Sequence, residues 1–391
     1  MPLLLLLAVT FSLQAEDWPQ FRGPDGEGHS SAKSLALTWS ETDHIKWKSP
    51  IPGKGWSSPA ILDGRIWLTT AIDQSLHAIA IDQKTGRIIL DKEVFNPGKL
   101  GAQHAKNTHA SPTPILEGDR IYVHFGAHGT SALNTKGDIL WTAHMQYSHM
   151  HGTGGSPVLY KDLLIFSCDG TDVQYVVALD KATGKVRWKT PRHAAMAYAT
   201  PLIITVDGKD QLISPGALRG VAYEPLTGKE LWSVSFGDGF SNVPRPVFAH
   251  GLLFLPTGFN RADLLAVKPG GEVAWKYTRS VPLTPSPIVV GDELYTVSDN
   301  GIATCFDARS GSVHWTQRLG GNFSASPVSA AGRIYFQNEE GVTTVIEPGK
   351  AFRKLASNQL DGATLASLAV SGDTIYLRTA THLYSICCDD K

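Results

Sequence analysis

The amino-acid sequence predicts an all-β fold, an eight-bladed β-propeller of four-stranded antiparallel blades. Three observations predict it. One pattern of short strands and turns recurs about every 40–50 residues, segments such as 64–69 and 332–337 alternate like half-buried strands, and no window has a helical apolar period. A single four-stranded blade cannot bury both of its faces, but stacked neighbouring blades can.

Each repeat opens with Ser-Pro or Thr-Pro and continues with a short apolar strand, a glycine turn and a second strand. A third strand runs into a Thr-Gly-Lys-like turn, and the fourth strand often ends in Trp. The clearest copy extends from Gly155 to Trp188. Seven copies are explicit, and their openings are Ser58-Pro59, Ser111-Pro112, Ser156-Pro157, Thr200-Pro201, Arg245-Pro246, Ser286-Pro287 and Ser326-Pro327.

The two ends of the chain are predicted to meet in the eighth blade. An eighth copy begins near Thr364 and supplies only three strands. The segment His44–Ile51 has the character of a fourth strand, so pairing it with the last copy would close the ring and remove exposed edges. We therefore expect the propeller to span 44–391, preceded by a lead-in at 16–43.

The first fifteen residues resemble a secretory signal peptide, with an apolar run from Leu3 to Leu13 before Ala15. That run is too short to span a bilayer, and no other segment approaches about 20 apolar residues. The net charge of −1 and the lack of a basic patch disfavour a nucleic-acid partner. We expect an exported monomer, periplasmic or extracellular, without a transmembrane segment.

The repeated Thr-Gly-Lys turn and strand-ending Trp over 44–391 resemble those of the PQQ-like propellers, a family that includes quinoprotein alcohol dehydrogenases and the BamB-type assembly scaffold. The opening DWPQFRGPDGEG, Asp17 to Gly28, resembles the lead-in of secreted bacterial members of uncharacterised function. The resemblance implies the fold. It does not imply one chemistry, because a single fold hosts unrelated functions.

In such a propeller the first strand of each blade lines the central channel, so residues just before each proline should lie at the channel mouth. The residue directly before the proline is Ser or Thr in six copies and Arg245 in the seventh. Arg245 could bind a carboxylate or phosphate, or pair with a neighbouring acid to close the channel. The residues three positions before the proline are Trp56, His109, Gly154, Tyr198, Val243, Thr284 and Ser324.

Histidines and long loops are concentrated in the second and third copies. A cluster of His109, His149 and His151 could bind Zn or Cu, but no spacing matches a known ligand motif, so we predict no metal. The loops at 96–109 and 149–155 insert at equivalent places in adjacent blades, and loops on one face of a repeat array often form its binding face.

The quinoprotein dehydrogenases carry a vicinal disulfide beside the quinone and a calcium-binding set of acids and amides. Cys387-Cys388 falls in the third strand of the last blade, which is the wrong place for that disulfide. Asp169 and Asn322 are the candidates for calcium ligands, but each is alone in its blade and sits in a common turn sequence. Neither a haem-attachment motif nor a nucleophile elbow is present.

These observations favour a non-catalytic binding or scaffold module for a protein, peptide or carbohydrate partner in the cell envelope, with no cofactor. Two alternatives stay open. One is a PQQ- and calcium-dependent alcohol or sugar dehydrogenase with Asp169 as base, and the other is a histidine-based metal-binding propeller. The candidate ligand-binding residues at the channel mouth are Trp56, Asn107, His109, His151, Asp169, Tyr198, Arg245 and Asn322.

Overall fold

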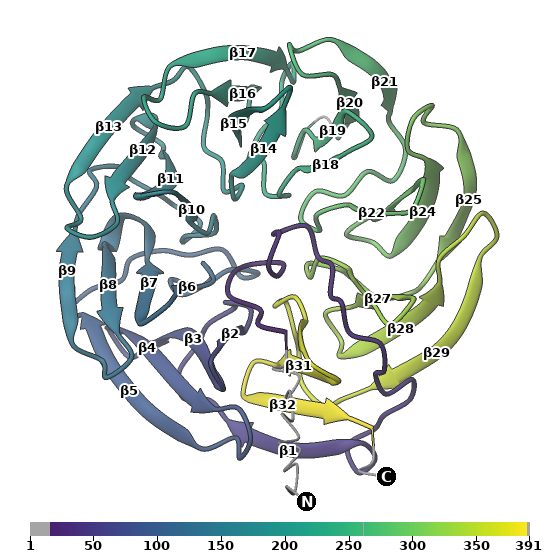
Figure 1. Cartoon of the computed structure of the whole chain (residues 1–391), viewed down its shortest axis with the longest axis horizontal. Coiled ribbons are helices and arrows are strands. Elements are labelled where there is room, and N and C mark those ends of the chain that lie inside the picture. The colour runs from purple at the N-terminus through teal and green to yellow at the C-terminus, as the bar shows by residue number, and fades with distance from the viewer. Residues whose placement is uncertain (1–15, 261, 389–391) are drawn as a thin grey trace, which may run out of the picture.

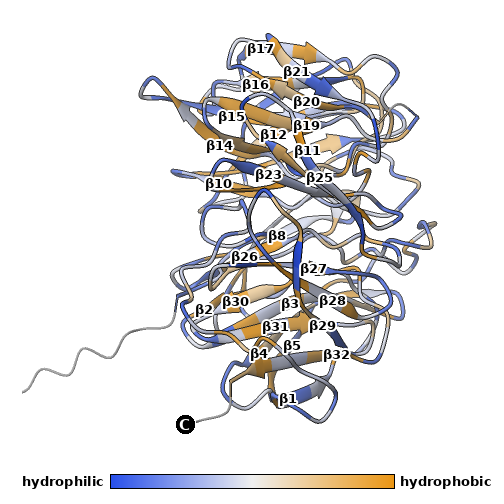
Figure 2. Cartoon of the chain, turned by 90° about the vertical axis from the view of Figure 1, so that its right-hand side faces the viewer, coloured by the Kyte–Doolittle hydropathy of each residue, from blue (hydrophilic) through white to orange (hydrophobic). Residues whose placement is uncertain are grey.

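The computed structural model describes residues 16–260 and 262–388 and confirms the predicted fold class. Eight four-stranded antiparallel sheets form a closed ring (Figure 1). The described residues contain one helical element, the 3-10 turn η1 (Gly126–His128). The predicted signal peptide at 1–15 lies outside the described residues. Viewed from the side, the ring is a thick disc with apolar residues concentrated in its strands (Figure 2).

The first four blades follow one another around the ring, and the strands of each run outward from the axis in chain order (Figure 1). The innermost strands are short, because the blades are most crowded near the axis. The strands of these blades are β2 (Ala60–Leu62), β3 (Arg65–Ile72), β4 (Ser75–Asp82) and β5 (Ile88–Phe95); β6 (Ile115–Glu117), β7 (Arg120–His124), β8 (Thr130–Asn134) and β9 (Ile139–Ala143); β10 (Val158–Tyr160), β11 (Leu163–Asp169), β12 (Gln174–Asp180) and β13 (Val186–Pro191); and β14 (Leu202–Val206), β15 (Lys209–Pro215), β16 (Arg219–Tyr223) and β17 (Glu230–Ser235).

The remaining four blades repeat this order, and the eighth takes its outermost strand from the N-terminal part of the chain. The strands of these blades are β18 (Val247–Ala249), β19 (Leu252–Pro256), β20 (Leu264–Val267) and β21 (Val273–Tyr277); β22 (Ile288–Val290), β23 (Glu293–Val297), β24 (Ile302–Asp307) and β25 (Val313–Arg318); β26 (Val328–Ala330), β27 (Arg333–Gln337), β28 (Val342–Glu347) and β29 (Arg353–Gln359); and β30 (Ala369–Ser371), β31 (Thr374–Arg378), β32 (His382–Cys387) and β1 (Ile45–Pro50). The predicted closure is confirmed, because β1 pairs antiparallel with β32 from Ile45 opposite Ile386 to Pro50 opposite His382.

The repeated Trp and Thr-Gly turn are two halves of one contact between neighbouring blades. The indole of Trp141 donates a 3.0 Å hydrogen bond to the Lys181 carbonyl, in the outer turn of the next blade. Gly184 in that turn has φ +72°, and a Cβ there would lie 2.5 Å from the Trp141 ring. Glycine is therefore required both for the turn and for the close approach of the indole. Trp188 makes the same contact with the next turn, donating 3.0 Å to the Pro225 carbonyl.

The opening of the second blade lies two residues later than the sequence pattern suggested. In the first blade β2 begins directly after Pro59, and in the second β6 begins directly after Pro114, not after Pro112. The tandem Ser-Pro-Thr-Pro at 111–114 offers two openings, and the structure uses the second. The equivalent of Trp56 is therefore Ser111, and the alignment that placed His109 there was wrong.

The lead-in crosses one end of the ring (purple in Figure 1) and is tied to several innermost strands. Trp18 forms a β-bridge with Ile61 and is fully buried, and the amide of Leu116 donates a 2.8 Å hydrogen bond to the Pro19 carbonyl. Ile61 and Leu116 each come two residues after a blade-opening proline. The lead-in therefore sits farther along the channel than the residues that precede the prolines.

Candidate functional site

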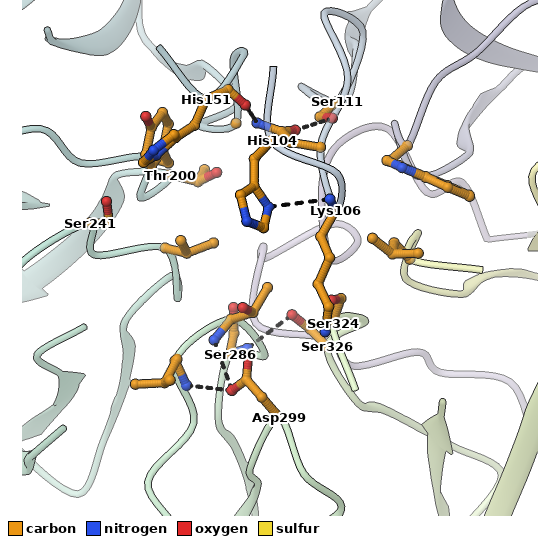
Figure 3. Close-up of a pocket in the computed structure, with 18 of the residues that line it drawn as sticks. His104, Lys106, Ser111, His151, Thr200, Ser241, Ser286, Asp299, Ser324 and Ser326 are labelled. Carbon is orange, nitrogen blue, oxygen red and sulfur yellow. Dashed lines mark hydrogen bonds between the residues drawn. The ribbon is translucent and has the colours of Figure 1, made fainter. Parts of the chain in front are cut away.

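A cavity of about 610 Å³ opens along the axis of the ring, and all eight blades contribute to its wall (Figure 3). We call it the funnel. Its outer tier is formed by the residues three positions before the blade-opening prolines and by Leu365, their equivalent in the eighth blade. These outer-tier residues are Trp56, Ser111, Gly154, Tyr198, Val243, Thr284, Ser324 and Leu365. The repeat thus predicted this tier correctly in six of its seven explicit copies, with the second blade as the exception.

A ring of hydroxyl groups forms the inner tier of the funnel, at the position directly before each proline. Each hydroxyl oxygen accepts a hydrogen bond from the backbone N–H of the equivalent residue in the preceding blade, at 2.9–3.1 Å. These bonds tie adjacent blades together around the axis. The seven members of this hydroxyl ring are Ser58, Thr113, Ser156, Thr200, Ser286, Ser326 and Ser367.

Arg245 interrupts the hydroxyl ring, and its side chain is buried beneath the lead-in. Its guanidinium donates a 3.0 Å hydrogen bond from Nη1 to the Phe21 carbonyl. Gly26 packs against the same group, since a Cβ there would lie 2.1 Å from Nη1. Burial lowers the pKa of Arg245 to about 10, although the nearby carboxylates of Glu27 and Asp25 oppose that shift. Arg245 is not among the residues that line the funnel.

Phe21 closes the inner end of the funnel. It is the lead-in residue that lines the cavity, and the next residue, Arg22, fixes the segment by donating from Nη2 to the carbonyl oxygens of Pro287 at 2.8 Å and Glu27 at 2.5 Å. Because the lead-in lies beyond the hydroxyl ring, the propeller channel becomes a pocket with one open end.

The two inserted loops form part of the outer wall. Asn107 donates a 2.8 Å hydrogen bond from Nδ2 to the His151 carbonyl, which also accepts a 3.1 Å bond from the His104 amide (Figure 3). From the same loop Lys106 reaches across the mouth to Glu339 in the seventh blade, with 2.9 Å between Nζ and Oε1. This ion pair joins opposite parts of the rim.

The structure brings four of the eight predicted site residues together. Trp56, Asn107, His151 and Tyr198 all line the funnel, and the rings of His151 and Tyr198 are 6.0 Å apart. The hydroxyl of Tyr198 is buried without a hydrogen-bond partner in the described chain.

The other predicted site residues lie outside the funnel lining, as Arg245 does. Asp169 forms a buried ion pair with Arg192, which donates to Oδ1 from Nε at 2.9 Å. Asn322 is exposed, and its side chain donates a 3.2 Å hydrogen bond to Glu340. His109 is buried behind the second blade's loop.

Sequence reasoning missed several lining residues, notably Asp299, His104 and Lys106. Asp299 follows the second strand of the sixth blade, and its Oδ2 accepts hydrogen bonds from the amides of Leu283 at 2.7 Å and Thr284 at 3.3 Å. Burial raises the pKa of Asp299 above its ordinary value. The turn after a second strand reaches the same end of the channel as the blade opening, so the repeat pattern could have pointed to Asp299.

His109, His128 and His149 form a cluster of imidazoles behind the funnel wall. His128 Nε2 is 3.3 Å from His109 Nδ1, and the His128 and His149 rings are 5.6 Å apart. Burial and then the neighbouring imidazoles lower the pKa of His149 to about 4. Among the described residues, no group of three or more His, Cys, Asp or Glu side chains is arranged to hold a metal ion.

The funnel residues do not fit a calcium–quinone centre. Asp299 is the one carboxylate among the described lining residues, and its Oδ2 accepts two backbone N–H groups. Asp169 is instead paired with Arg192, and Cys388 contacts Ser34 of the lead-in, with 3.9 Å between sulfur and oxygen. Among the described residues, therefore, no cysteine lines this cavity, and neither of the predicted calcium candidates, Asp169 and Asn322, faces it.

Comparison with known proteins decides the family. The sequence model described as "Outer membrane protein assembly factor BamB" matches residues 47–202 and 260–387. The chain belongs to this family of PQQ-like propellers. The described part of the chain contains no helix that is long and apolar enough to cross a membrane.

Curated relatives of this BamB-type propeller carry two different names. The chain is 32% identical to the tetrathionate hydrolase of Acidithiobacillus ferrooxidans over 337 residues, which cover 78% of this chain and 55% of that protein. It is 24% identical to BamB of Legionella pneumophila over 201 residues, 48% of this chain and 50% of that protein. The chain thus spans about half the length of these relatives.

Solved structures share the fold of this chain. BamB of Moraxella catarrhalis superposes with a TM-score of 0.63 at 14% identity, covering 88% of this chain and 99% of that one. The quinohemoprotein alcohol dehydrogenase of Comamonas testosteroni gives 0.71 at 12% identity, covering 96% and 81%. At such low identity these similarities establish the fold alone.

Proposed function

We propose that this protein is a non-catalytic binding module of the cell envelope, and that its funnel holds a segment of a protein or peptide. The observation that carries the proposal is the closure of the channel by Phe21, which creates a concave pocket with one mouth. Such pockets, with apolar walls and a few placed polar groups, are the usual form of ligand sites.

The wall of the funnel suits a partly apolar chain. Aromatic side chains come from different segments of the chain, and aliphatic ones lie between them. Asn107 and His151 add polar groups at one side of the mouth. An extended peptide could bury side chains against the aromatic walls and satisfy its backbone at the polar groups. The aromatic and aliphatic lining residues are Phe21, Trp56, Tyr198, Phe240, Val243, Phe259, Leu283 and Leu365.

The envelope assignment rests on two further observations. The predicted signal peptide implies export, and the family model is named for a factor of the outer membrane. Fractionation of cells that produce the full chain tests this part of the proposal, since recovery in the cytosol alone would contradict it.

Isothermal titration of the purified protein with short peptides and neutral oligosaccharides tests the binding role. We expect peptides to bind, and Trp56→Ala or Tyr198→Ala to weaken binding at least about tenfold, as loss of a buried aromatic anchor does. Leu231→Ala, on the exposed outer strand β17, is the matched control and should leave binding unchanged. Oligosaccharide binding that depends on Trp56 would reassign the partner, and binding of neither class would reject the proposal.

A second candidate function is hydrolysis of a polythionate, favoured by the 32% identity to tetrathionate hydrolase. Asp299 is the described carboxylate available in the funnel for such chemistry. Incubation with tetrathionate and assay of its hydrolysis products distinguishes the two functions. Turnover that is lost in Asp299→Asn would overturn the non-catalytic assignment.

A further inference from the structure

The hydroxyl ring at the inner end of the funnel has seven protons that no described residue accepts. Each ring oxygen already accepts a backbone N–H from the preceding blade, as shown above. A hydroxyl carries one proton that it can donate, in addition to its acceptor sites. None of the seven makes such a donation to another described residue. These seven donors therefore line the cavity without a partner.

The hydroxyl ring is more than nine-tenths buried at every position. Thr113 and Ser286 are each 2% exposed, and Thr200 and Ser326 are each 4% exposed. Buried donors without acceptors are costly in a folded protein, so their presence marks a place where a ligand or solvent supplies acceptors. Several adjacent donors around one rim suit a group with more than one acceptor oxygen.

Three buried guanidinium groups surround the funnel outside its lining. Two of them, Arg245 and Arg22, lie at the inner end and hold the lead-in, where the carboxylates of Glu27 and Asp25 are close to both. Arg378 sits at the seam between the eighth and first blades and donates from Nη1 to the carbonyl oxygens of Ser57 and Thr69, each at 3.0 Å.

Arg378 makes no ion pair with a carboxylate of the described chain, and Ser57 directly precedes the hydroxyl-ring member Ser58. The three guanidinium groups therefore outnumber the two carboxylates, Glu27 and Asp25, that lie near Arg22 and Arg245. This excess positive charge around the funnel favours an anion bound at the hydroxyl ring.

The funnel's own carboxylate lies nearer the mouth. Asp299 accepts the amides of Leu283 and Thr284, and Thr284 belongs to the outer tier. Lys106 stabilises the negative charge of Asp299 from the rim. The funnel therefore has hydrogen-bond donors at its closed end, with the guanidinium of Arg378, which pairs with no described carboxylate, beside them, and an acceptor closer to its open end.

From this arrangement we infer that the hydroxyl ring binds a carboxylate, and that the peptide in the funnel enters with its C-terminal end first. The inference rests on the proposed peptide-binding function. A free chain end fits a pocket with one mouth, because an internal segment would have to enter and leave through the same opening. The carboxylate oxygens would accept hydrogen bonds from adjacent ring hydroxyls, with Arg22 and Arg245 beyond the ring and Arg378 at its side.

The experiment compares one short apolar peptide as the free acid and as the C-terminal amide, titrated into the full chain. We expect the free acid to bind at least about tenfold more tightly, since hydrogen bonds to a charged group are stronger than those to a neutral one. Thr200→Val and, independently, Thr113→Val keep the branched shape while removing one donor each, and each also removes the acceptor of one bond between blades, from the Ser156 or the Ser58 amide. Either variant should weaken the free acid about tenfold and leave the amide unchanged.

Two further variants distinguish loss of the hydroxyl's hydrogen bond to the ligand from a general loss of protein stability. Ser326→Thr retains the donor and should retain the preference for the free acid. Ser312→Ala makes the small-residue change in an outer turn, away from the funnel, and should change neither affinity. Thermal unfolding of each variant, measured in parallel, identifies any that does not fold.

The possible failures are distinguishable. Equal affinity for the acid and the amide would overturn the carboxylate inference while leaving the peptide-binding function intact. If neither a peptide nor an acidic sugar bound, both the proposed function and the inference would be rejected. Preference for glucuronate over glucose, with neither peptide bound, would overturn the peptide assignment and show that the ring takes the carboxylate of an acidic sugar.

Discussion

The guanidinium of Arg245 donates to the carbonyl oxygen of Phe21, so the blade that lacks a ring hydroxyl is the blade that holds the floor of the funnel. At this position the other explicit repeats carry a small hydroxyl that joins neighbouring blades. Arg245 retains the bond to the next blade, because its backbone N–H donates to Ser286 at 3.0 Å, but it has no hydroxyl to accept one from the preceding blade. Its side chain is used for the lead-in instead.

Substitution of Arg245 tests this division of roles. Arg245→Ser supplies the missing hydroxyl but removes the hydrogen bond from the guanidinium to the Phe21 carbonyl, which holds the lead-in. We expect the free energy of unfolding to fall by about 1.5–3 kcal/mol, as when a hydrogen bond from a charged group is lost. Limited proteolysis should release the lead-in faster than in the parent protein. Arg187→Ser, on the exposed surface, is the control and should change neither quantity.

Two turn glycines with the same φ provide a second test, Gly184 in an outer turn and Gly208 between β14 and β15. Gly184 and Gly208 both have φ +72°, but a Cβ at Gly184 would meet the Trp141 ring whereas at Gly208 it would meet open space. Gly208→Ala should therefore cost about 1–2 kcal/mol from backbone strain alone. Gly184→Ala should cost about 1–3 kcal/mol more, from overpacking against the indole. Urea denaturation measures the free energy of unfolding of the two variants. Equal decreases would show that the indole of Trp141 does not require glycine at position 184.

The buried histidines make stability depend on pH. Burial lowers the pKa of His124 to about 3 and, with repulsion from its neighbours, that of His149 to about 4, both below the ordinary value of 6.5. Between about pH 4 and 6.5 the unfolded chain therefore binds more protons than the folded one, and stability falls as the pH falls through that window. The free energy of unfolding measured from pH 7 to 4 should decrease, and His149→Gln should make the decrease shallower. An unchanged slope in that variant would contradict this assignment.

Quinone binding gives a prediction about ligands. Because the described lining of the funnel has a single carboxylate, Asp299, and no cysteine, titration with PQQ and Ca²⁺ should show no tight stoichiometric complex by quinone absorbance. Dye reduction with a panel of alcohols should likewise stay at the blank rate. A saturating absorbance change at one equivalent, accompanied by turnover, would show that the funnel binds the quinone and would contradict the prediction.

Most of the architecture was predictable from the sequence because a propeller repeats one physical contact. Trp141 and Gly184 belong to different blades, yet both recur in the pattern because most seams use the same contact, while at the first seam Leu90 takes the place of the Trp. The outer tier was predictable for the same reason. The predicted opening of the second blade was wrong because Ser111-Pro112 and Thr113-Pro114 match the repeat equally well. The folded chain distinguishes them by the hydrogen bond from the Ser58 amide to Thr113.

The non-repeating residues of the site could not be placed in advance. His104 and Lys106 come from the inserted loop at 96–109, outside the repeated pattern, and Lys106 pairs with Glu339, more than two hundred residues away. From its turn sequence Asp169 appeared free to bind a ligand. Its buried partner Arg192 follows β13 and comes next to it only when the third blade folds. Long-range pairings of this kind leave no local signature.

The pairing of β1 with β32 also sets the order of events during synthesis. β1 leaves the ribosome among the first strands, but its partner is the last, so the ring cannot close until nearly the whole chain is available. Contacts that join distant segments are slow to form, because the loop between them must first lose its freedom. Until then the growing array keeps an open strand edge at each end, where another copy could add. Closure is therefore the step at which refolding of this protein competes most directly with aggregation.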